Sequence, residues 1–203
     1  MIGIINYGMG NLHSVFKAFK WLGTIAEIVD SPEVVKNYDK LILPGVGNFD
    51  KGMQNLNSTG FVNIIKEQVL QKKIPLLGIC LGMQLLTSFS EEGDVQGLDL
   101  IDAKTIHFKN LGMPEQLKIP HIGWNNIILK NHSALLNYSE NAIVYFVHSY
   151  AVICNDKTNV ICETSYGTTF HSGIQKDNIY GLQFHPEKSH KAGLQILQNF
   201  IKL

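Results

Sequence analysis

The sequence predicts a doubly wound α/β domain with a mostly parallel sheet to which antiparallel hairpins are added. Short apolar runs alternate with amphipathic stretches through the first 90 residues, which is typical of parallel strands joined by helices. From about residue 94 to 180 the segments favour β-structure and have turn residues between them. The 203 residues show no repeat, low-complexity tract or linker, so residues 1–203 are expected to form a single domain.

The first half supplies the expected parallel strands and their helices. Strands are expected at 2–7 (IGIINY), 24–29 (TIAEIV), 41–49 (LILPGVGNF) and 74–79 (IPLLGI). Pro44 is expected to break the third of these, with a loop of two glycines after it. Helical spacing marks residues 12–23, which Gly23 stops, and residues 61–73, and a further helix is expected from residue 80 (CLGMQLLTSF).

The second half is expected to add hairpins to the same sheet and to end in a helix. The β-rich runs are AKTIHF (103–108), NNIILK (125–130), AIVYFVHSYAVIC (142–154), NVICETSY (159–166) and TTFHSGIQ (168–175). The last stretch, KAGLQILQNFIKL (191–203), predicts an amphipathic helix with Leu194, Leu197, Phe200 and Ile201 on one stripe.

Composition excludes several classes of function. Lys and Arg total 17, equal to Asp and Glu, so no charge excess favours nucleic acid. No apolar run reaches the roughly 18 residues that span a membrane, and the start lacks a signal peptide, so a cytoplasmic location is expected. The three cysteines form no C-x-x-C pair, so neither disulfides nor a metal site is expected, and Cys154 and Cys162 are interpreted as structural.

Cys80 lies between two glycines, after a buried strand and before a helix. The pattern G-x-C-x-G resembles a nucleophile elbow, in which glycines leave room for a strained turn that raises the side chain above the sheet edge. The start of the helix favours a thiolate, and the Leu81 N–H can point at an oxyanion. Free cysteines are also commonly buried packing residues, so the motif alone leaves both interpretations open.

A cysteine nucleophile needs a base and a group that orients it, and both occur in FHPEKS. His185 follows the apolar strand IYGLQF, and alternation along an extended segment brings Glu187 to the same side, so the two can touch. A solvated loop is the other interpretation of this segment. The glycine-flanked turn PGVG ends another strand and can direct the N–H of Val46 or Gly47 at the same site, although it can also be a plain turn.

Together these residues resemble a known family. GICLGMQ, FHPEKS and PGVG are similar to the motifs of class I (triad) glutamine amidotransferases, whose fold is flavodoxin-like. NYGMGNLHSV, PHIGWNN (120–126) and YFVHSYA (145–151) resemble, more narrowly, the glutaminase subunits of imidazole glycerol phosphate synthases. The resemblance covers essentially the whole chain.

The resemblance implies a role for each matching position. Cys80 would be the nucleophile, His185 the general base and then acid, and Glu187 the residue that orients it. Val46, Gly47 and Leu81 would form the oxyanion hole, and Gln84, Ser149 and Tyr150 would surround the glutamine. The positions that match the family's partner surface and tunnel mouth are His121, Trp124, Asn125, Tyr145 and Lys188.

The resemblance also implies a substrate and a partner. L-glutamine would be hydrolysed without a cofactor, and the ammonia would pass to a separate (β/α)8 barrel cyclase in histidine biosynthesis, forming a heterodimer. Departures from the common pattern at Asn6, His13, His107 and His190 leave the partner open. The alternatives are a paralogue that supplies a sugar amidotransferase of surface polysaccharide synthesis, a binding module without catalysis, and a stand-alone cysteine hydrolase of the flavodoxin-like peptidase type.

Overall fold

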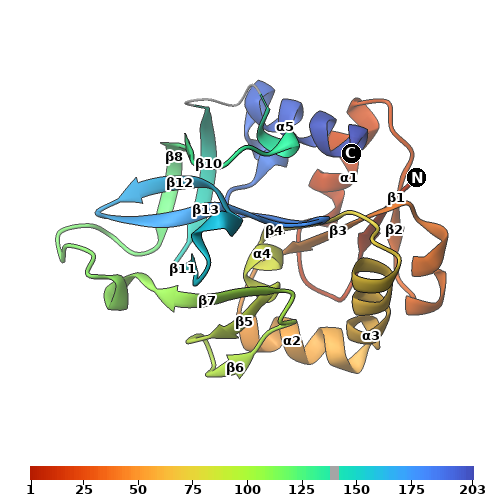
Figure 1. Cartoon of the computed structure of the whole chain (residues 1–203), viewed down its shortest axis with the longest axis horizontal. Helices are drawn as coiled ribbons and strands as arrows, with labels where there is room; N and C mark the ends of the chain where they lie inside the picture. Colours follow the sequence, from red (N-terminus) through yellow and green to blue (C-terminus); the bar gives the residue numbers. More distant parts are fainter. Residues whose placement is uncertain (138–141) are drawn as a thin grey trace.

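The computed structural model describes residues 1–137 and 142–203 and places most of its strands in one twelve-stranded sheet (Figure 1). Five strands form its parallel half, in the spatial order β2, β1, β3, β4, β14. Their bounds are Ala26–Val29 (β2), Ile2–Ile5 (β1), Lys40–Gly45 (β3), Leu76–Cys80 (β4) and Ile179–Leu182 (β14). Because β1 and β4 are buried along their whole length, they are apolar at every position.

The other half of this sheet is mostly antiparallel, as expected from the β-rich second half of the chain. Its strands are Thr168–Lys176 (β13), Tyr150–Cys154 (β11), Ile101–His107 (β7), Thr87–Ser90 (β5), Val95–Gln96 (β6), Val160–Tyr166 (β12) and Ile128–Leu129 (β9). Only β5 and β7 pair in parallel among them. One hairpin is not added to the sheet: His121–Asn126 (β8) and Ile143–His148 (β10) form a separate two-stranded ribbon, which corrects that part of the prediction.

Helices cover both faces of the parallel half, so the domain is doubly wound. Their bounds are Leu12–Trp21 (α1), Phe49–Ser58 (α2), Phe61–Lys66 (α3), Leu81–Leu85 (α4) and His190–Lys202 (α5). In Figure 1, α1 and α5 lie above the sheet while α2 and α3 lie below it, and each pair closes one of two apolar cores. None of the helices within the described residues is long and apolar enough to cross a membrane.

Several elements differ from the sequence prediction. The sequence pattern does not predict helix α2, although Phe49, Gly52, Met53 and Leu56 recur at helical spacing and are buried. Helix α4 was expected to be longer, but it has five residues because the chain turns into β5 at Thr87, whose buried hydroxyl donates to the Gln84 carbonyl at 2.8 Å.

Two further differences concern the ends of elements. Pro44 does not break β3, because the strand continues through it to Gly45. The segment expected to form one helix at 61–73 is α3 followed by a π-helical stretch, Glu67–Gln71.

Candidate active site

Cys80 lies at a strained turn between β4 and α4. It is the last residue of β4 and the N-cap of α4, and its φ of 55° and ψ of −112° are sterically costly for a residue with a Cβ. A Cβ on Gly82 would approach the Leu43 carbonyl oxygen to 1.7 Å, and one on Gly78 would approach the Gly82 oxygen to 2.7 Å. The two glycines therefore permit the turn to pack directly on β3, as the G-x-C-x-G pattern predicts.

His185 and Glu187 meet just beyond the end of β14, the strand beside β4. Leu182 pairs with Ile79, so the chain after β14 returns beside Cys80. The His185 Nδ1 and a Glu187 carboxylate oxygen lie 2.8 Å apart, and both side chains are almost completely buried. The predicted contact is present, but its predicted cause is wrong: Pro186–Lys188 is a 3₁₀ turn rather than an extended segment.

The electrostatic surroundings favour a protonated His185. Burial works against the charged ring, but the hydrogen bond with the Glu187 carboxylate and the influence of the nearby Cys80 raise the pKa of His185 to about 9. Among the described residues, its Nε2 has no hydrogen-bond partner, although Cys80 is close enough to affect its pKa. In an enzyme without substrate such a contact is commonly long and tightens when substrate binds.

A cavity of about 330 Å³ opens in front of Cys80. The three predicted oxyanion residues all line it: Val46 and Gly47 come from the turn after β3, and Leu81 comes from the first turn of α4. Gly45 pairs with Cys80 in the sheet, which brings the turn after β3 beside the elbow, and Gly47 has a φ of 107° that favours glycine. The structure thus brings PGVG and GICLG together, as expected from strands that end at one edge.

The residues predicted to surround glutamine also line this cavity. They are Gln84, Ser149 and Tyr150, and Gln84 Nε2 donates to the Tyr150 carbonyl at 3.2 Å and to Gln183 Oε1 at 3.0 Å. Gln183 in turn donates to Cys80 Sγ at 3.8 Å, and this sulfur lies 3.8 Å from the Val147 carbonyl that accepts its thiol hydrogen. A short polar chain therefore connects the cavity wall with the candidate nucleophile.

Two polar residues of the site are not predicted by the sequence motifs: Glu92, which lines the cavity, and Gln183, which contacts Gln84 and Cys80 behind its wall. Glu92 lines the cavity and accepts hydrogen bonds from Asn48 Nδ2 at 3.1 Å and from the Phe49 N–H at 2.8 Å. Gln183 stands two residues before His185, and this closeness to the HPE motif is a usable signal in the sequence. Glu92 gave none, because the segment SEEGD resembles an ordinary acidic turn and reaches the cavity only through contacts 43 residues away.

The residues expected at a partner surface separate into two groups. Trp124 is 47 % exposed on the outer face of β8, where it stacks on His190 with ring centroids 4.8 Å apart and packs edge-on against Tyr145. The Lys188 ammonium lies 5.8 Å from the centre of the Tyr145 ring. We call this set, the exposed Trp124 and His190 with the half-buried Tyr145 and Lys188, the aromatic face.

His121 does not belong to the aromatic face. It is 3 % exposed and lies on the inner side of β8, stacked between Phe146 and Tyr166. Successive residues of a strand point to opposite sides, so His121 and Trp124, three residues apart, cannot share a face. Asn125 is on the inner side too, at the partly exposed edge, where its amide donates to the Ser165 carbonyl.

The other cysteines lie in the β-rich half and are buried. Burial raises the pKa of the Cys154 thiol and of the Cys162 thiol to about 12, which suits packing residues rather than nucleophiles. Across residues 1–137 and 142–203, no group of three His, Cys, Asp or Glu side chains is placed to hold a metal ion.

Comparisons with known proteins agree with these motifs. The family model "Glutamine amidotransferase class-I" matches residues 3–203. The imidazole glycerol phosphate synthase subunit HisH 2 of Methanococcus maripaludis is 52 % identical over 203 residues, covering 100 % of this chain and 99 % of the relative. The subunit HisH of Sulfurimonas denitrificans is 49 % identical over 203 residues, covering 100 % and 98 %.

A crystal structure of a glutamine amidotransferase, at 16 % identity, superposes with a TM-score of 0.75 over 99 % of this chain and 97 % of that chain, which shows the shared fold. The family model and the full-length relatives go further than this likeness of fold. This chain belongs to the class I glutamine amidotransferase family, in the group of imidazole glycerol phosphate synthase HisH subunits.

Proposed function

We propose that this chain hydrolyses L-glutamine to L-glutamate and ammonia with Cys80 as nucleophile. The observation that carries the proposal is the position of Cys80, held with a positive φ in the wall of a cavity, beside a buried His185–Glu187 pair on the neighbouring strand. A cysteine, a histidine and a carboxylate in this relation form an activated nucleophile. The packing interpretation of Cys80 does not account for its strained backbone or for its place at the cavity.

The chemistry follows from the protonation of the pair. The Cys80 thiolate forms a bond to the side-chain amide carbon of glutamine, and the carbonyl electrons move to oxygen, where the N–H groups of Val46 or Gly47 and of Leu81 stabilise the charge. The intermediate collapses and ammonia leaves with the proton of His185. Water then attacks the γ-glutamyl thioester, gives a proton to His185, and releases glutamate and the thiolate.

Glu92 supplies the cavity with a group for the other end of the substrate. Apart from Cys80 itself, it is the charged side chain among the described residues that line the cavity, because burial keeps the His148 ring neutral. A carboxylate there can pair with the α-ammonium of glutamine. The free α-carboxylate would then lie near backbone N–H groups of the wall around Ser149.

The ammonia is proposed to pass to a separate synthase. Ammonia released into water near pH 7 becomes ammonium, which is not a nucleophile, so the product is useful only beside an acceptor site. The aromatic face, with exposed Ile122 and Ile143 beside it, offers the aromatic and apolar side chains that anchor protein interfaces. We propose a cytoplasmic heterodimer with a (β/α)8 barrel cyclase that forms imidazole glycerol phosphate in histidine biosynthesis.

A second partner is favoured by one observation. His190, one of the positions that depart from the common family pattern, lies in the aromatic face and stacks on Trp124. A paralogue can supply ammonia to a different synthase, such as a sugar amidotransferase of surface polysaccharide synthesis. Purification of the tagged chain from its native cell separates the two, since a barrel cyclase or a sugar-modifying enzyme would accompany it.

The decisive experiment uses Cys80→Ala in the complex purified from the native cell. We expect glutamine-dependent synthesis to be lost, because no thioester can form, while synthesis from added ammonium salt and binding of the synthase remain. Cys154→Ala is the matched control, since its thiol is buried away from the cavity and activity should be retained. Glutamine-dependent activity in the Cys80→Ala complex would overturn the proposal.

A further inference from the structure

Two buried histidines outside the triad are joined by a hydrogen bond. His121 on β8 and His148 on β10 pair in the register of the ribbon, and His121 Nδ1 lies 3.0 Å from His148 Nε2. They are 3 % and 6 % exposed, and His148 lines the cavity in front of Cys80. The hydrolysis mechanism above uses neither ring.

The cavity end of this pair fixes which nitrogens carry hydrogen. His148 Nδ1 lies 2.7 Å from the Tyr150 carbonyl oxygen, which can only accept, so Nδ1 carries the hydrogen. In a neutral ring Nε2 is then an acceptor, and the hydrogen of the bond between the rings must belong to His121 Nδ1.

The outer end leads to the same assignment independently. Asn125 Oδ1 accepts the Asn126 N–H at 2.8 Å, which directs its Nδ2 toward the Ser165 carbonyl at 2.9 Å and toward His121 Nε2 at 3.4 Å. Since an amide NH₂ can only donate, His121 Nε2 is an acceptor and His121 Nδ1 carries the hydrogen. Both ends therefore require one direction of donation, from Asn125 to His121 to His148 to the Tyr150 carbonyl. We call this series of hydrogen bonds the relay.

The surroundings keep this direction fixed at neutral pH. Burial lowers the pKa of His121 to about 4. For His148, burial lowers the pKa to about 3, because the opposing bond to the Tyr150 carbonyl is outweighed and the charges of His121 and His185 add to the lowering. Phe146 and Tyr166 stack on the two faces of the His121 ring, with centroids 4.8 and 4.1 Å away, so the ring cannot turn freely.

We infer that His121 and His148 are positioning residues that hold the wall of the glutamine cavity and tie it to strand β8, which carries Trp124 of the aromatic face. The carbonyl that ends the relay, that of Tyr150, also accepts from Gln84, and the Val147 carbonyl on the other side of His148 accepts from Cys80. Loss of the relay frees this wall without removing any group of the triad. The inference rests on the proposed function, because it takes glutamine as the ligand of the cavity.

The kinetic test compares two substitutions at His121 in the complex purified from the native cell. His121→Leu removes the donor to His148, and His121→Asn keeps an N–H near the position of Nδ1. We expect His121→Leu to raise KM for glutamine about tenfold, the effect of one lost buried hydrogen bond, with kcat nearly unchanged. His121→Asn should have a KM for glutamine much closer to that of the wild type.

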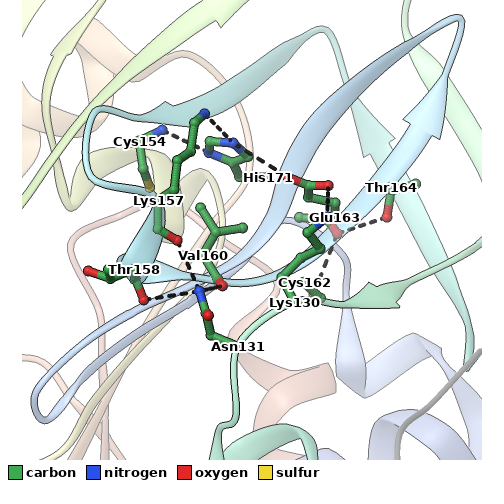
Figure 2. A network of polar contacts seen from close by, with 11 residues as sticks. Lys130, Asn131, Cys154, Lys157, Thr158, Val160, Cys162, Glu163, Thr164 and His171 are labelled. Carbon is green, nitrogen blue, oxygen red and sulfur yellow. Dashed lines mark hydrogen bonds and ion pairs between the residues drawn. The ribbon is translucent and has the colours of Figure 1, made fainter.

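His171 provides a matched control within the same chain. It is also a buried neutral histidine, and its Nδ1 accepts the Cys154 N–H at 2.8 Å while Lys157 and Glu163 face its Nε2 (Figure 2). None of these partners lines the cavity. His171→Leu should therefore lower stability like His121→Leu while KM for glutamine stays at the wild-type value.

The relay itself is tested by the ¹⁵N resonances of the imidazole rings in the full chain, which need no activity. We expect His121 and His148 both to carry hydrogen on Nδ1 and to stay unchanged from about pH 8 to about pH 5.5, across the ordinary histidine pKa of about 6.5. Hydrogen on Nε2 of either ring overturns the relay. An unchanged KM in His121→Leu overturns the positioning role while glutamine hydrolysis stands. Glutamine-dependent activity in Cys80→Ala overturns the proposed function, and with it the positioning role, while the hydrogen positions on the two rings stand.

Discussion

At the scale of single residues, Glu92 tests how the cavity recognises an amino acid. Its carboxylate faces the cavity while its two oxygens accept from Asn48 and Phe49. We expect Glu92→Gln to raise KM for glutamine about tenfold or more with little change in kcat, because the charge that pairs with the α-ammonium is lost while the shape is kept. Steady-state glutaminase kinetics of the complex measure this.

Glu91→Gln is the control for that substitution. Glu91 is the adjacent carboxylate, and it accepts from the His107 N–H at 2.8 Å and from Asn110 Nδ2 at 2.9 Å without lining the cavity. Its KM should equal that of the wild type. Equal effects of the two substitutions would show that the loop, and not the charge of Glu92, determines binding.

The residues that could be predicted are those whose neighbours in sequence already specify them. Gly78 and Gly82 around Cys80, and Pro186 between His185 and Glu187, are local signals of a turn. Glu92 could not be found in this way, because the contact that places it spans 43 residues. His121 and Trp124 lie in one motif, and only the pairing of β8 with β10 shows that they point to opposite sides of a strand.

At the scale of elements, the turn from β4 to α4 depends on the absence of a side chain at Gly82. A Cβ there would lie 1.7 Å from the Leu43 carbonyl oxygen, a backbone atom of β3 that cannot move without disturbing the sheet. We expect Gly82→Ala to lower the free energy of unfolding by at least the roughly 1–3 kcal/mol of an overpacked core, and to impair Cys80 as well. Chemical denaturation of the purified variant measures the first effect.

Gly52→Ala is the control for this steric effect. Gly52 lies inside α2, and its Cβ would meet only the flexible ends of two side chains, Leu85 at 3.1 Å and Leu81 at 3.6 Å. Alanine is the better helix former by about 1 kcal/mol, so the variant should be neutral or more stable. A Gly82→Ala protein as stable as Gly52→Ala would contradict the account of the turn.

The elements that the sequence did not predict correctly share a physical cause. The apolar stripe of α2 is interrupted by Gly52 and by asparagines of low helix propensity, so its helix is stabilised by the core it covers and not by its own residues. Helix α4 is short because β5 pairs with β7, a contact between distant segments. The parallel strands could be predicted because burial on both faces makes them uniformly apolar.

At the scale of the whole molecule, three buried histidines make stability depend on pH. Burial lowers the pKa of His121 and of His171 to about 4 and that of His148 to about 3, whereas in the unfolded chain each has a pKa of about 6.5. Below that value the unfolded state binds protons that the native state does not. Their contribution to stability is therefore complete above about pH 6.5 and is lost as the pH falls toward 4.

His185 has the opposite effect on stability, so the pH range of the test must be one in which its contribution is constant. Because its pKa is raised to about 9, its contribution is complete below about pH 6.5 and is lost as the pH rises through 9. Between pH 6 and 5 the three neutral histidines dominate, and each is expected to lower the free energy of unfolding by up to ~1.4 kcal/mol per pH unit. Urea denaturation at pH 7, 6 and 5 measures the combined effect of the three histidines on the free energy of unfolding. In His171→Leu, the free energy of unfolding should fall less steeply with pH, by the contribution of one histidine. Equal slopes for the two proteins would mean that His171 takes up its proton in the native state, which its burial beside Lys157 opposes.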